Sequence, residues 1–245
     1  MVSIDANEMH YKVLNEKIQA LASQGEKHLE LQNVCGQKFI GDGLQGNVKI
    51  DIYGIPGNDM AAFMDGPEIE VHCNGQDSIG NTMNAGKVVI HGHAGDVIGY
   101  AMRGGKIFIR DGVGYRVGIH MKAYQDNVPY IVIGGNACNF FGEYMAGGVM
   151  VLLGLNNADG NPIAGDYVGS GMHGGVIYIR GDVEDRLLAR DVKKVELDAE
   201  DKARLEPLVK EYCQHFGCDY NKVMSKPFIK LVPKSARPYG NMYVS

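Results

Sequence analysis

The histidines are the side chains of this sequence with the clearest capacity for chemistry. His91 and His93 stand two residues apart, and a pair of imidazoles can ligate one metal ion. His120 and His173 occupy similar points of later repeats. Because no third ligand follows at a spacing typical of a metal site, we interpret these histidines as solvent-facing turn residues. A metal-binding protein or an enzyme that uses His91 and His93 is kept as an alternative hypothesis.

Aspartates and one cysteine are the next candidates. Asp77, Asp96 and Asp166 each precede a short apolar step, where carboxyl groups in a cleft could act in general acid–base chemistry. An aspartate that accepts a hydrogen bond from its own backbone at a turn is the simpler interpretation. Cys138 has no sequence neighbour that marks a nucleophile, so we expect it to be a small buried hydrophobic residue.

The cysteines form an odd set without a Cys-x-x-Cys pair. Their spacing argues against a zinc ribbon and against an iron–sulfur cluster with the usual local ligands. We therefore expect reduced thiols at all of the cysteine positions, which are Cys35, Cys73, Cys138, Cys213 and Cys218.

Gly41, Gly43 and Gly46 match the letters of the dinucleotide-binding pattern Gly-x-Gly-x-x-Gly. That site needs a helix after the third glycine, because the helix N-terminus faces the pyrophosphate. Residues 47–53 instead read NVKIDIY, which is a strand pattern, so we interpret the glycines as turns. With no constellation that supports catalysis, we assign no catalytic, cofactor-binding or metal-ligating residue and expect no cofactor in this chain.

The bulk composition is typical of a globular protein. The chain has 245 residues, of which 45% are hydrophobic, and a formal net charge of −5. Lys and Arg are scattered, which argues against nucleic acid as a partner. No segment reaches the roughly 18 apolar residues of a membrane-spanning helix, and the N-terminal residues lack the apolar core of a signal peptide. We therefore expect a cytoplasmic protein with no membrane partner.

A repeat dominates the middle of the sequence. Glycine and methionine recur three residues apart in five blocks, from Gly80 with Met83 to Gly169 with Met172. From Met64 onward these methionines follow one another at steps of 19, 19, 19, 24 and 27 residues. The repeat is therefore a unit of about 19 residues with late insertions. We interpret the methionine ladder as core filling and not as a soft-metal surface.

Each repeat has the pattern of short strands. In residues 87–91, Val88 and Ile90 point one way, while Val89 and its neighbours point the other way. A second short apolar step precedes each repeated glycine, as in DSIG and DVIG. Two brief strands per repeat with no helix between them predict one coil of a β-helix, whose inward side chains stack in ladders. A left-handed hexapeptide helix is disfavoured, because the aliphatic residues do not recur at every sixth position.

Helical patterns flank the repeat. Asp5 and Glu8 suggest the capping box of a helix near residues 6–23, and the charged stretch before Gly217 has apolar residues at helical spacing. We expect these helices to cap the open ends of the solenoid, and the tail from Pro227 to be an extended arm. The predicted divisions are a helical cap over 1–30, a β-helix over 31–183, and a helical segment with an extended tail over 184–245.

The phrases GNTMNAGKVVIHGHAGDVIGYAMRGGKIFIR and GYRVGIHMK resemble the GXGXG domain at the C-terminus of the large subunit of glutamate synthase. The resemblance covers residues 5–235 and includes the tail motif FIKLVP. It implies a mainly β fold, namely a right-handed single-stranded parallel β-helix of about seven coils with N- and C-terminal helical caps. The handedness comes from the resemblance, since spacing alone does not supply it.

The resemblance also implies a function. In glutamate synthases an amidotransferase domain hydrolyses glutamine, ammonia passes internally, and a domain with FMN and an iron–sulfur cluster reduces 2-iminoglutarate. This chain has no FMN barrel pattern and no cysteine cluster. We therefore expect a non-catalytic structural subunit with no activity alone. It would hold glutamine amidotransferase and FMN/iron–sulfur synthase subunits in register, and both cofactors would lie on those partner chains.

Two further hypotheses about partners stay open. One scaffold-type polypeptide of formylmethanofuran dehydrogenase belongs to the same fold family, and that assignment would place the chain beside a molybdenum or tungsten enzyme. The outward apolar residues Val89 and Phe108 could form a contact in a homo-oligomer, or could instead be the interface of the hetero-complex.

Overall fold

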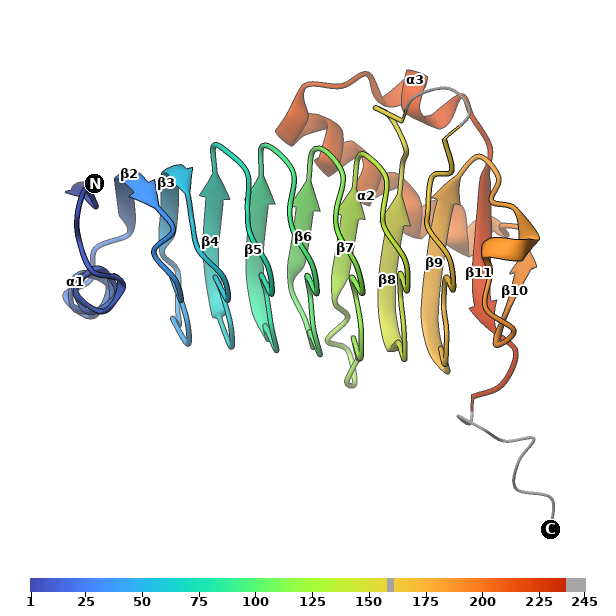
Figure 1. Ribbon diagram of the computed structural model, residues 1–245, viewed down its shortest axis with the longest axis horizontal. Coiled ribbons are helices and arrows are strands. Elements are labelled where there is room, and N and C mark those ends of the chain that lie inside the picture. Colours follow the sequence, from blue (N-terminus) through green and yellow to red (C-terminus); the bar gives the residue numbers. More distant parts are fainter. Residues whose placement is uncertain (158–160, 237–245) are drawn as a thin grey trace, which may run out of the picture.

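The computed structural model describes residues 1–157 and 161–236, and its described part is mainly β (Figure 1). None of its helices is long and apolar enough to cross a membrane. Along the chain the elements are β1 (Val2–Asp5), α1 (Tyr11–Ser23), β2 (His28–Cys35), β3 (Lys49–Ile55), β4 (Asp65–Val71), β5 (Ala85–Ile90), β6 (Lys106–Ile109), β7 (Tyr130–Ile133), β8 (Ala146–Leu152), β9 (Gly174–Arg180), a 3-10 turn (Asp185–Leu187), β10 (Val192–Val195), α2 (Ala199–Phe216), α3 (Tyr220–Met224) and β11 (Phe228–Pro233).

The strands form one sheet that winds as a β-solenoid. From β1 to β9 each strand pairs in parallel with the next strand of the sequence, so every coil contributes one strand to the same face (Figure 1). Ile69 lies opposite Val88, and Val88 lies opposite Ile107, which is the 19-residue step of the sequence repeat. The prediction of a mainly β solenoid is confirmed.

The second predicted strand of each coil is wrong, because the chain forms a corner there. In the coil before β6, the backbone φ angles of Val97, Gly99 and Ala101 are +61°, +69° and +50°. Left-handed residues at alternate positions cannot form an extended strand. The apolar residue between them, Ile98, is nevertheless fully buried, so the apolar step in the sequence marks a corner that supplies core side chains.

The interior of the solenoid consists of stacked side-chain ladders. Inward residues of successive strands, such as Ile69, Val88 and Ile107, lie in register and are at most 1% exposed. The methionine ladder is part of this core, which confirms the interpretation as core filling. Its members are Met64, Met83, Met102, Met121, Met145 and Met172, each of them at most 2% exposed.

The N-terminus differs in detail from the prediction. Val2–Asp5 is a strand paired in parallel with β2, and α1 begins only at Tyr11, with His10 as its N-cap. The predicted capping box of Asp5 and Glu8 is therefore wrong, because the backbone there is already used by the sheet. The carboxylate of Asp5 instead accepts a hydrogen bond from the backbone N–H of Asn7 at 3.0 Å.

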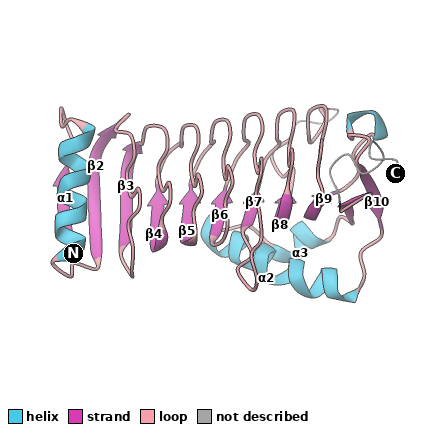
Figure 2. Cartoon of the chain, turned by 90° about the horizontal axis from the view of Figure 1, so that it is seen from below, coloured by secondary structure: helices cyan, strands magenta, loops and turns pink. Residues whose placement is uncertain are grey.

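The predicted C-terminal helix is confirmed, but its predicted position is wrong. Helix α2 ends before Gly217, which has a left-handed φ of +68°. The helix runs alongside the later strands and does not cover the open end of the stack (Figure 2). That end is occupied by β11 and β10, because β11 pairs antiparallel with β9 and β10 pairs with β11. The predicted extended arm is thus partly wrong: Phe228–Pro233 is a strand, and residues 237–245 lie outside the described part.

A buried carboxylate fixes the start of α2 to the sheet. Asp201 is 2% exposed and forms a capping box with Asp198. Its Oδ1 accepts a hydrogen bond from the hydroxyl of Tyr178 at 2.7 Å, and its Oδ2 lies 2.8 Å from Nζ of Lys230. Burial works to raise the pKa of Asp201, but the hydrogen bonds from Lys230, Tyr178 and the backbone of Asp198 outweigh burial and lower the pKa to about 2.

The depressed pKa of Asp201 predicts an acid-dependent loss of stability. The unfolded carboxyl takes up its proton near pH 4, whereas the folded one stays ionised to about pH 2. This contribution, about 2 kcal/mol, should be complete above pH 4 and should be lost as the pH falls toward 2. Urea unfolding of the wild type and of Asp201→Asn at several pH values checks it. The stability difference between the two proteins should shrink below pH 4, and a constant difference would contradict the assignment.

Candidate functional site

The outward face of the sheet is divided into a polar and an apolar half. The central outward position of each strand carries a carboxylate in the first coils and an apolar or aromatic side chain in the later ones. In register along the stack, this row of side chains reads Glu30, Asp51, Glu70, Val89, Phe108, Val132, Val151 and Tyr178.

Helix α2 covers the apolar half. Val89 and Phe108 are only 2% and 0% exposed, because they pack in one cluster with the apolar face of the helix. The ring of Phe108 lies 5.2 Å from the ring of His215 of α2. The expectation that Val89 and Phe108 contact another chain is therefore wrong: the chain covers these residues with its own helix.

Polar contacts hold α2 in this position. The hydroxyl of Tyr212 donates to the carbonyl oxygen of Arg110 at 2.9 Å, and Nζ of Lys106 lies 2.6 Å from the carboxylate of Glu211. Gly134 makes the first contact possible, since a Cβ there would lie 1.8 Å from the Tyr212 hydroxyl oxygen. The end of α2 consequently stops beside the polar half of the face.

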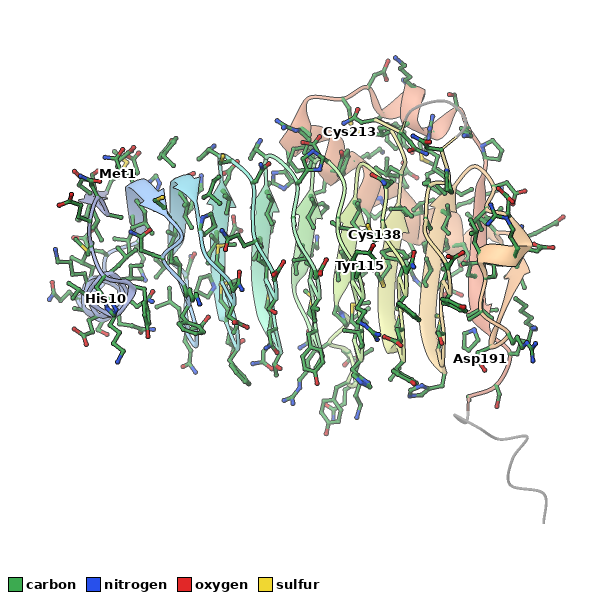
Figure 3. The ribbon with its side chains drawn as sticks, in the orientation of Figure 1. Met1, His10, Tyr115, Cys138, Asp191 and Cys213 are labelled. Atoms are coloured by element: carbon green, nitrogen blue, oxygen red, sulfur yellow. The ribbon has the colours of Figure 1, made fainter. Side chains whose placement is uncertain are left out.

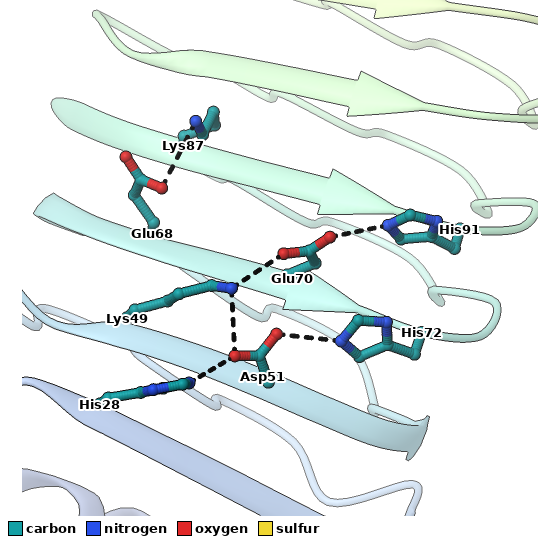
Figure 4. Close-up of polar contacts among 8 residues, drawn as sticks. All are labelled: His28, Lys49, Asp51, Glu68, Glu70, His72, Lys87 and His91. Atoms are coloured by element: carbon teal, nitrogen blue, oxygen red, sulfur yellow. Dashed lines mark hydrogen bonds and ion pairs between the residues drawn. The ribbon is translucent and has the colours of Figure 1, made fainter. Parts of the chain in front are cut away.

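The polar half carries a cluster that we call the histidine–carboxylate cluster (Figure 4). Its members are His28, Lys49, Asp51, Glu70, His72 and His91. Asp51 is 5% exposed and is the centre of the first group of contacts. Its Oδ2 lies 2.6 Å from Nε2 of His28 and 3.2 Å from Nζ of Lys49, and its Oδ1 lies 2.9 Å from Nε2 of His72.

Glu70 is the centre of the second group of contacts. Its Oε1 lies 2.9 Å from Nε2 of His91, and its Oε2 lies 3.1 Å from Nζ of Lys49. Lys49 therefore joins the two carboxylates (Figure 4). The imidazole rings of His72 and His91 are stacked, with centroids 5.4 Å apart. On its other side, the ring of His91 contacts Phe216 edge to face at 5.2 Å.

The charges of the cluster support one another. Burial works to raise the pKa of Asp51 and of Glu70, but the hydrogen bonds from histidine and Lys49 outweigh it and hold both pKa values below their ordinary range. Burial works to lower the pKa of Lys49, whereas the hydrogen bonds to Glu70 and Asp51 raise it, with a net increase. The two carboxylates and the ammonium group are therefore all charged at neutral pH.

Three members of the cluster can hold a metal ion. One ligand atom each of Glu70, His72 and His91 lie within 4.8 Å of one another. His93 does not take part, because its side chain is 68% exposed and its Nδ1 accepts a hydrogen bond from the backbone of Gly112. The interpretation as a solvent-facing turn residue is thus confirmed for His93 and wrong for His91, whose side chain is 24% exposed.

The other two histidines lie apart from the cluster. The ring of His120 stacks on Tyr144 with centroids 5.2 Å apart. Nδ1 of His173 lies 3.1 Å from the carbonyl oxygen of Gly171. The structure therefore brings His91 together with His72 and Glu70, and with none of the other histidines that the sequence suggested.

The repeated aspartates join neighbouring coils. Oδ1 of Asp77 accepts a hydrogen bond from the backbone N–H of Asp96 at 2.9 Å, and Oδ1 of Asp96 accepts one from Tyr115 at 2.8 Å. The prediction that such aspartates bind their own backbone is wrong for these two, because the acceptor serves the next coil. Asp166 is exposed, and its own backbone N–H donates to Oδ1 of Asn139.

The glycine pattern near residue 41 forms turns, as predicted. Gly41 and Gly43 have left-handed φ angles of +77° and +60°, and the strand β3 follows them. Between them, burial and the nearby Asp59 raise the pKa of Asp42 to about 7, although its Oδ1 accepts a hydrogen bond from the backbone of Ala62. Asp42 lines a hollow beside α1, but no second catalytic group with a shifted pKa lines it in the described residues.

The cysteines are free thiols, as predicted. Cys138 lies in the turn between β7 and β8, whereas Cys213 lies on α2 (Figure 3). Cys138 is half-buried, not buried as expected, and burial raises the pKa of its thiol, which disfavours a role as nucleophile. The sulfur atoms of Cys213 and Cys218 lie 2.7 Å apart, at the end of α2.

A second surface feature runs along the left-handed corners. The guanidinium of Arg116 lies 4.5 Å from the ring of Phe140, and that ring stacks on Tyr167 at 5.1 Å. Beside this row, the ring of His120 lies between Tyr100 and Tyr144. We call these residues the aromatic corner: Tyr100, Arg116, His120, Phe140, Tyr144 and Tyr167.

Sequence reasoning missed the histidine–carboxylate cluster, although a signal was present. Asp51 and Glu70 are one 19-residue period apart, and so are His72 and His91. Residues one period apart lie on adjacent strands, about 4.8 Å from each other. Applying the period to the polar residues as well as to the methionines would have placed these four side chains together.

Comparisons with known proteins bear on the whole chain. The sequence model of the GXGXG motif matches residues 12–236. An uncharacterized protein of Methanocaldococcus jannaschii is 50% identical over 252 residues, which cover 99% of this chain and 96% of the relative. Ferredoxin-dependent glutamate synthase 2 of Synechocystis is 26% identical over 206 residues, which cover 79% of this chain and 13% of the synthase.

Proposed function

Since this chain belongs to the GXGXG-motif family, we propose that it is a non-catalytic structural subunit of a glutamate-synthase-type complex. Its partners in this proposal are a glutamine amidotransferase chain and a synthase chain that carries FMN and an iron–sulfur cluster. The chain would hold the two partners at a fixed distance, so that ammonia released by one is used by the other before it reaches water.

One observation carries the proposal. The chain aligns with a glutamate synthase over most of its own length, yet it corresponds to a small part of that enzyme. Any chemistry of the synthase that lies in the remainder must then come from other chains. The described residues support a structural role, because the repeated aspartates bridge adjacent coils instead of gathering in one cleft.

The solenoid has the stiffness that a spacer needs. Backbone hydrogen bonds join each coil to the next at the corners as well as in the sheet, for example from Gly99 to Ile79 and from Gly118 to Ile98, both at 2.8 Å. The parallel pairings from β2 to β9 correspond to a length of roughly 34 Å at the usual strand spacing. A partner bound at one end is thereby held at a defined distance from the other.

The aromatic corner is the surface that we propose for a partner contact. Tyr167 and Tyr100 are 56% and 38% exposed, and both belong to stacked rows that keep their side chains ordered. Aromatic and arginine side chains in such rows lose little conformational entropy on binding, which is why they are enriched at interfaces. The outward face of the later strands is not available for this purpose, because α2 covers it.

Affinity purification of the chain from its native cells tests the proposal. We expect an amidotransferase and a flavin-containing iron–sulfur protein to copurify, with flavin absorbance in the complex and none in the isolated chain. Copurification of a molybdenum or tungsten enzyme would favour the formylmethanofuran dehydrogenase alternative. A lone, colourless protein at low salt would contradict the scaffold proposal.

Paired variants test the proposed contact surface. Tyr167→Ser should weaken capture of a partner, because it removes an exposed ring from the aromatic corner. Tyr53→Ser is the matched control: Tyr53 is 39% exposed but stacks on His72, in the histidine–carboxylate cluster. Equal capture by both variants would move the interface away from the aromatic corner while leaving the scaffold proposal to the purification.

A further inference from the structure

We propose that Glu70, His72 and His91 form a binding site for a divalent transition-metal ion, with Zn²⁺ as the probe that fits the ligands. The site lies on the outward face where β4 and β5 end, beside the last turn of α2. It is separate from the aromatic corner and does not depend on the scaffold proposal.

The chemical types of the ligands support this assignment. Two imidazoles and one carboxylate form a ligand set found in catalytic zinc sites, and also in non-haem iron sites. Both imidazole nitrogens are already directed at carboxylate oxygens, Nε2 of His72 at Asp51 and Nε2 of His91 at Glu70, each at 2.9 Å. A metal ion would replace the shared proton as the positive partner of these groups.

The fold delivers the ligands together. His72 and His91 follow Val71 and Ile90, which are paired residues of β4 and β5, so their side chains leave the sheet at the same level. Glu70 precedes His72 by two residues and therefore points to the same side of β4. The ligand atoms lie within 4.8 Å of one another, and they need to approach by about 1 Å for metal–ligand bonds near 2 Å.

The surroundings can orient the ligands without closing the site. Phe216 packs edge to face on the ring of His91, and Tyr53 stacks on the ring of His72 at 4.5 Å. These contacts limit rotation of both imidazoles. The side chains of Glu70 and His91 are each 24% exposed and that of His72 is 30% exposed, so solvent can reach the ion and fill its remaining coordination positions.

Lys49 is the group that opposes a cation here. Its ammonium lies 3.1 Å from Oε2 of Glu70, on the carboxylate oxygen that does not contact His91. Glu70 can therefore keep Lys49 on one oxygen and offer the other to a metal ion. Because the ammonium and the ion repel each other over this short distance, removing the ammonium should strengthen metal binding.

Calorimetric titration of the chelator-treated full chain with Zn²⁺ tests the site. We expect saturable binding of one ion per chain. His72→Ala and His91→Ala should each weaken the affinity at least about tenfold, as losses from metal sites do. His93→Ala is the matched control: it removes a nearby exposed histidine outside the cluster and should leave the affinity unchanged.

Two further variants separate the site from nonspecific histidine binding. Glu70→Gln preserves the shape of the side chain and should also weaken Zn²⁺ binding, whereas Lys49→Gln should tighten it. The visible absorption of the Co²⁺-loaded chain should be lost in His91→Ala, while circular dichroism without metal should show that this variant stays folded. Absence of saturable Zn²⁺ binding, or binding that persists in the His72→Ala, His91→Ala double variant, would overturn the proposal.

Discussion

Replacing Gly99 by alanine should lower the free energy of unfolding by about 2–5 kcal/mol. The left-handed φ of +69° costs an alanine about 1–2 kcal/mol. The added Cβ would also lie 2.4 Å from Cδ1 of Ile131 inside a filled core, and such overpacking costs about 1–3 kcal/mol. Chemical denaturation of the variant and the wild type measures the difference.

The chain itself contains the control for this prediction. Ala61 occupies the equivalent corner position of an earlier coil: its φ is +63°, it is fully buried, and its N–H donates to the previous coil as that of Gly99 does. In the ladder that contains Ile131, the strand residue facing the Ala61 coil is Val88, which has no terminal δ-methyl group. The left-handed corner thus tolerates a Cβ where the facing side chain is shorter.

A double variant tests this explanation. Ile131→Val alone should cost about 0.5–1.5 kcal/mol, because it removes one buried methyl group. Combined with Gly99→Ala, the same change should restore part of the lost stability, because it provides space for the new Cβ. If the two effects simply add, steric contact with Ile131 is not the reason for glycine at this position.

Replacing Phe108 by alanine should destabilise the protein by about 3–5 kcal/mol and loosen α2. Phe108 is fully buried at the contact between the sheet and the helix, so the variant leaves a cavity against His215 and the apolar face of α2. Unfolding measurements give the loss of stability. Hydrogen exchange should show faster exchange of the backbone N–H groups of residues 199–216 than in the wild type.

The matched control for Phe108 is Phe63→Ala. Phe63 is 58% exposed on a corner of the solenoid, so removing its ring should change stability by less than about 0.5 kcal/mol. Unchanged hydrogen exchange in α2 of the Phe108→Ala variant would contradict the view that this side chain anchors the helix. Unchanged stability would show that the cavity closes without cost.

Sequence reasoning succeeded where a structural preference is local. Gly217 ends α2 because a left-handed residue terminates a helix, and the apolar residues before it have helical spacing. It failed at Asp5, whose capping signal is overridden by the pairing of β1 with β2. The edge of a sheet is a tertiary contact, and a local motif contains no information about it.

The candidate site was predicted less well than the fold. His91 was selected for its spacing to His93, but its partners are Glu70 and His72, 21 and 19 residues earlier in the chain. Polar residues that meet across coils need no local motif. The apolar residues Val89 and Phe108 were correctly assigned to the outward face, but nothing in their own segments indicated that α2 would cover them.

The amino-acid sequence by itself determined the repeating coil, its period and the material of its core. These features follow from glycine and methionine spacing, because each coil forms the same short-range turns and buries the same positions. Only the tertiary structure decided that α2 lies along the outward face and not over the end, and that the histidine–carboxylate cluster lies beside it. Stacking turns a distance of one period in the sequence into a direct contact, and the docking of a distant helix then determines which outward side chains stay accessible.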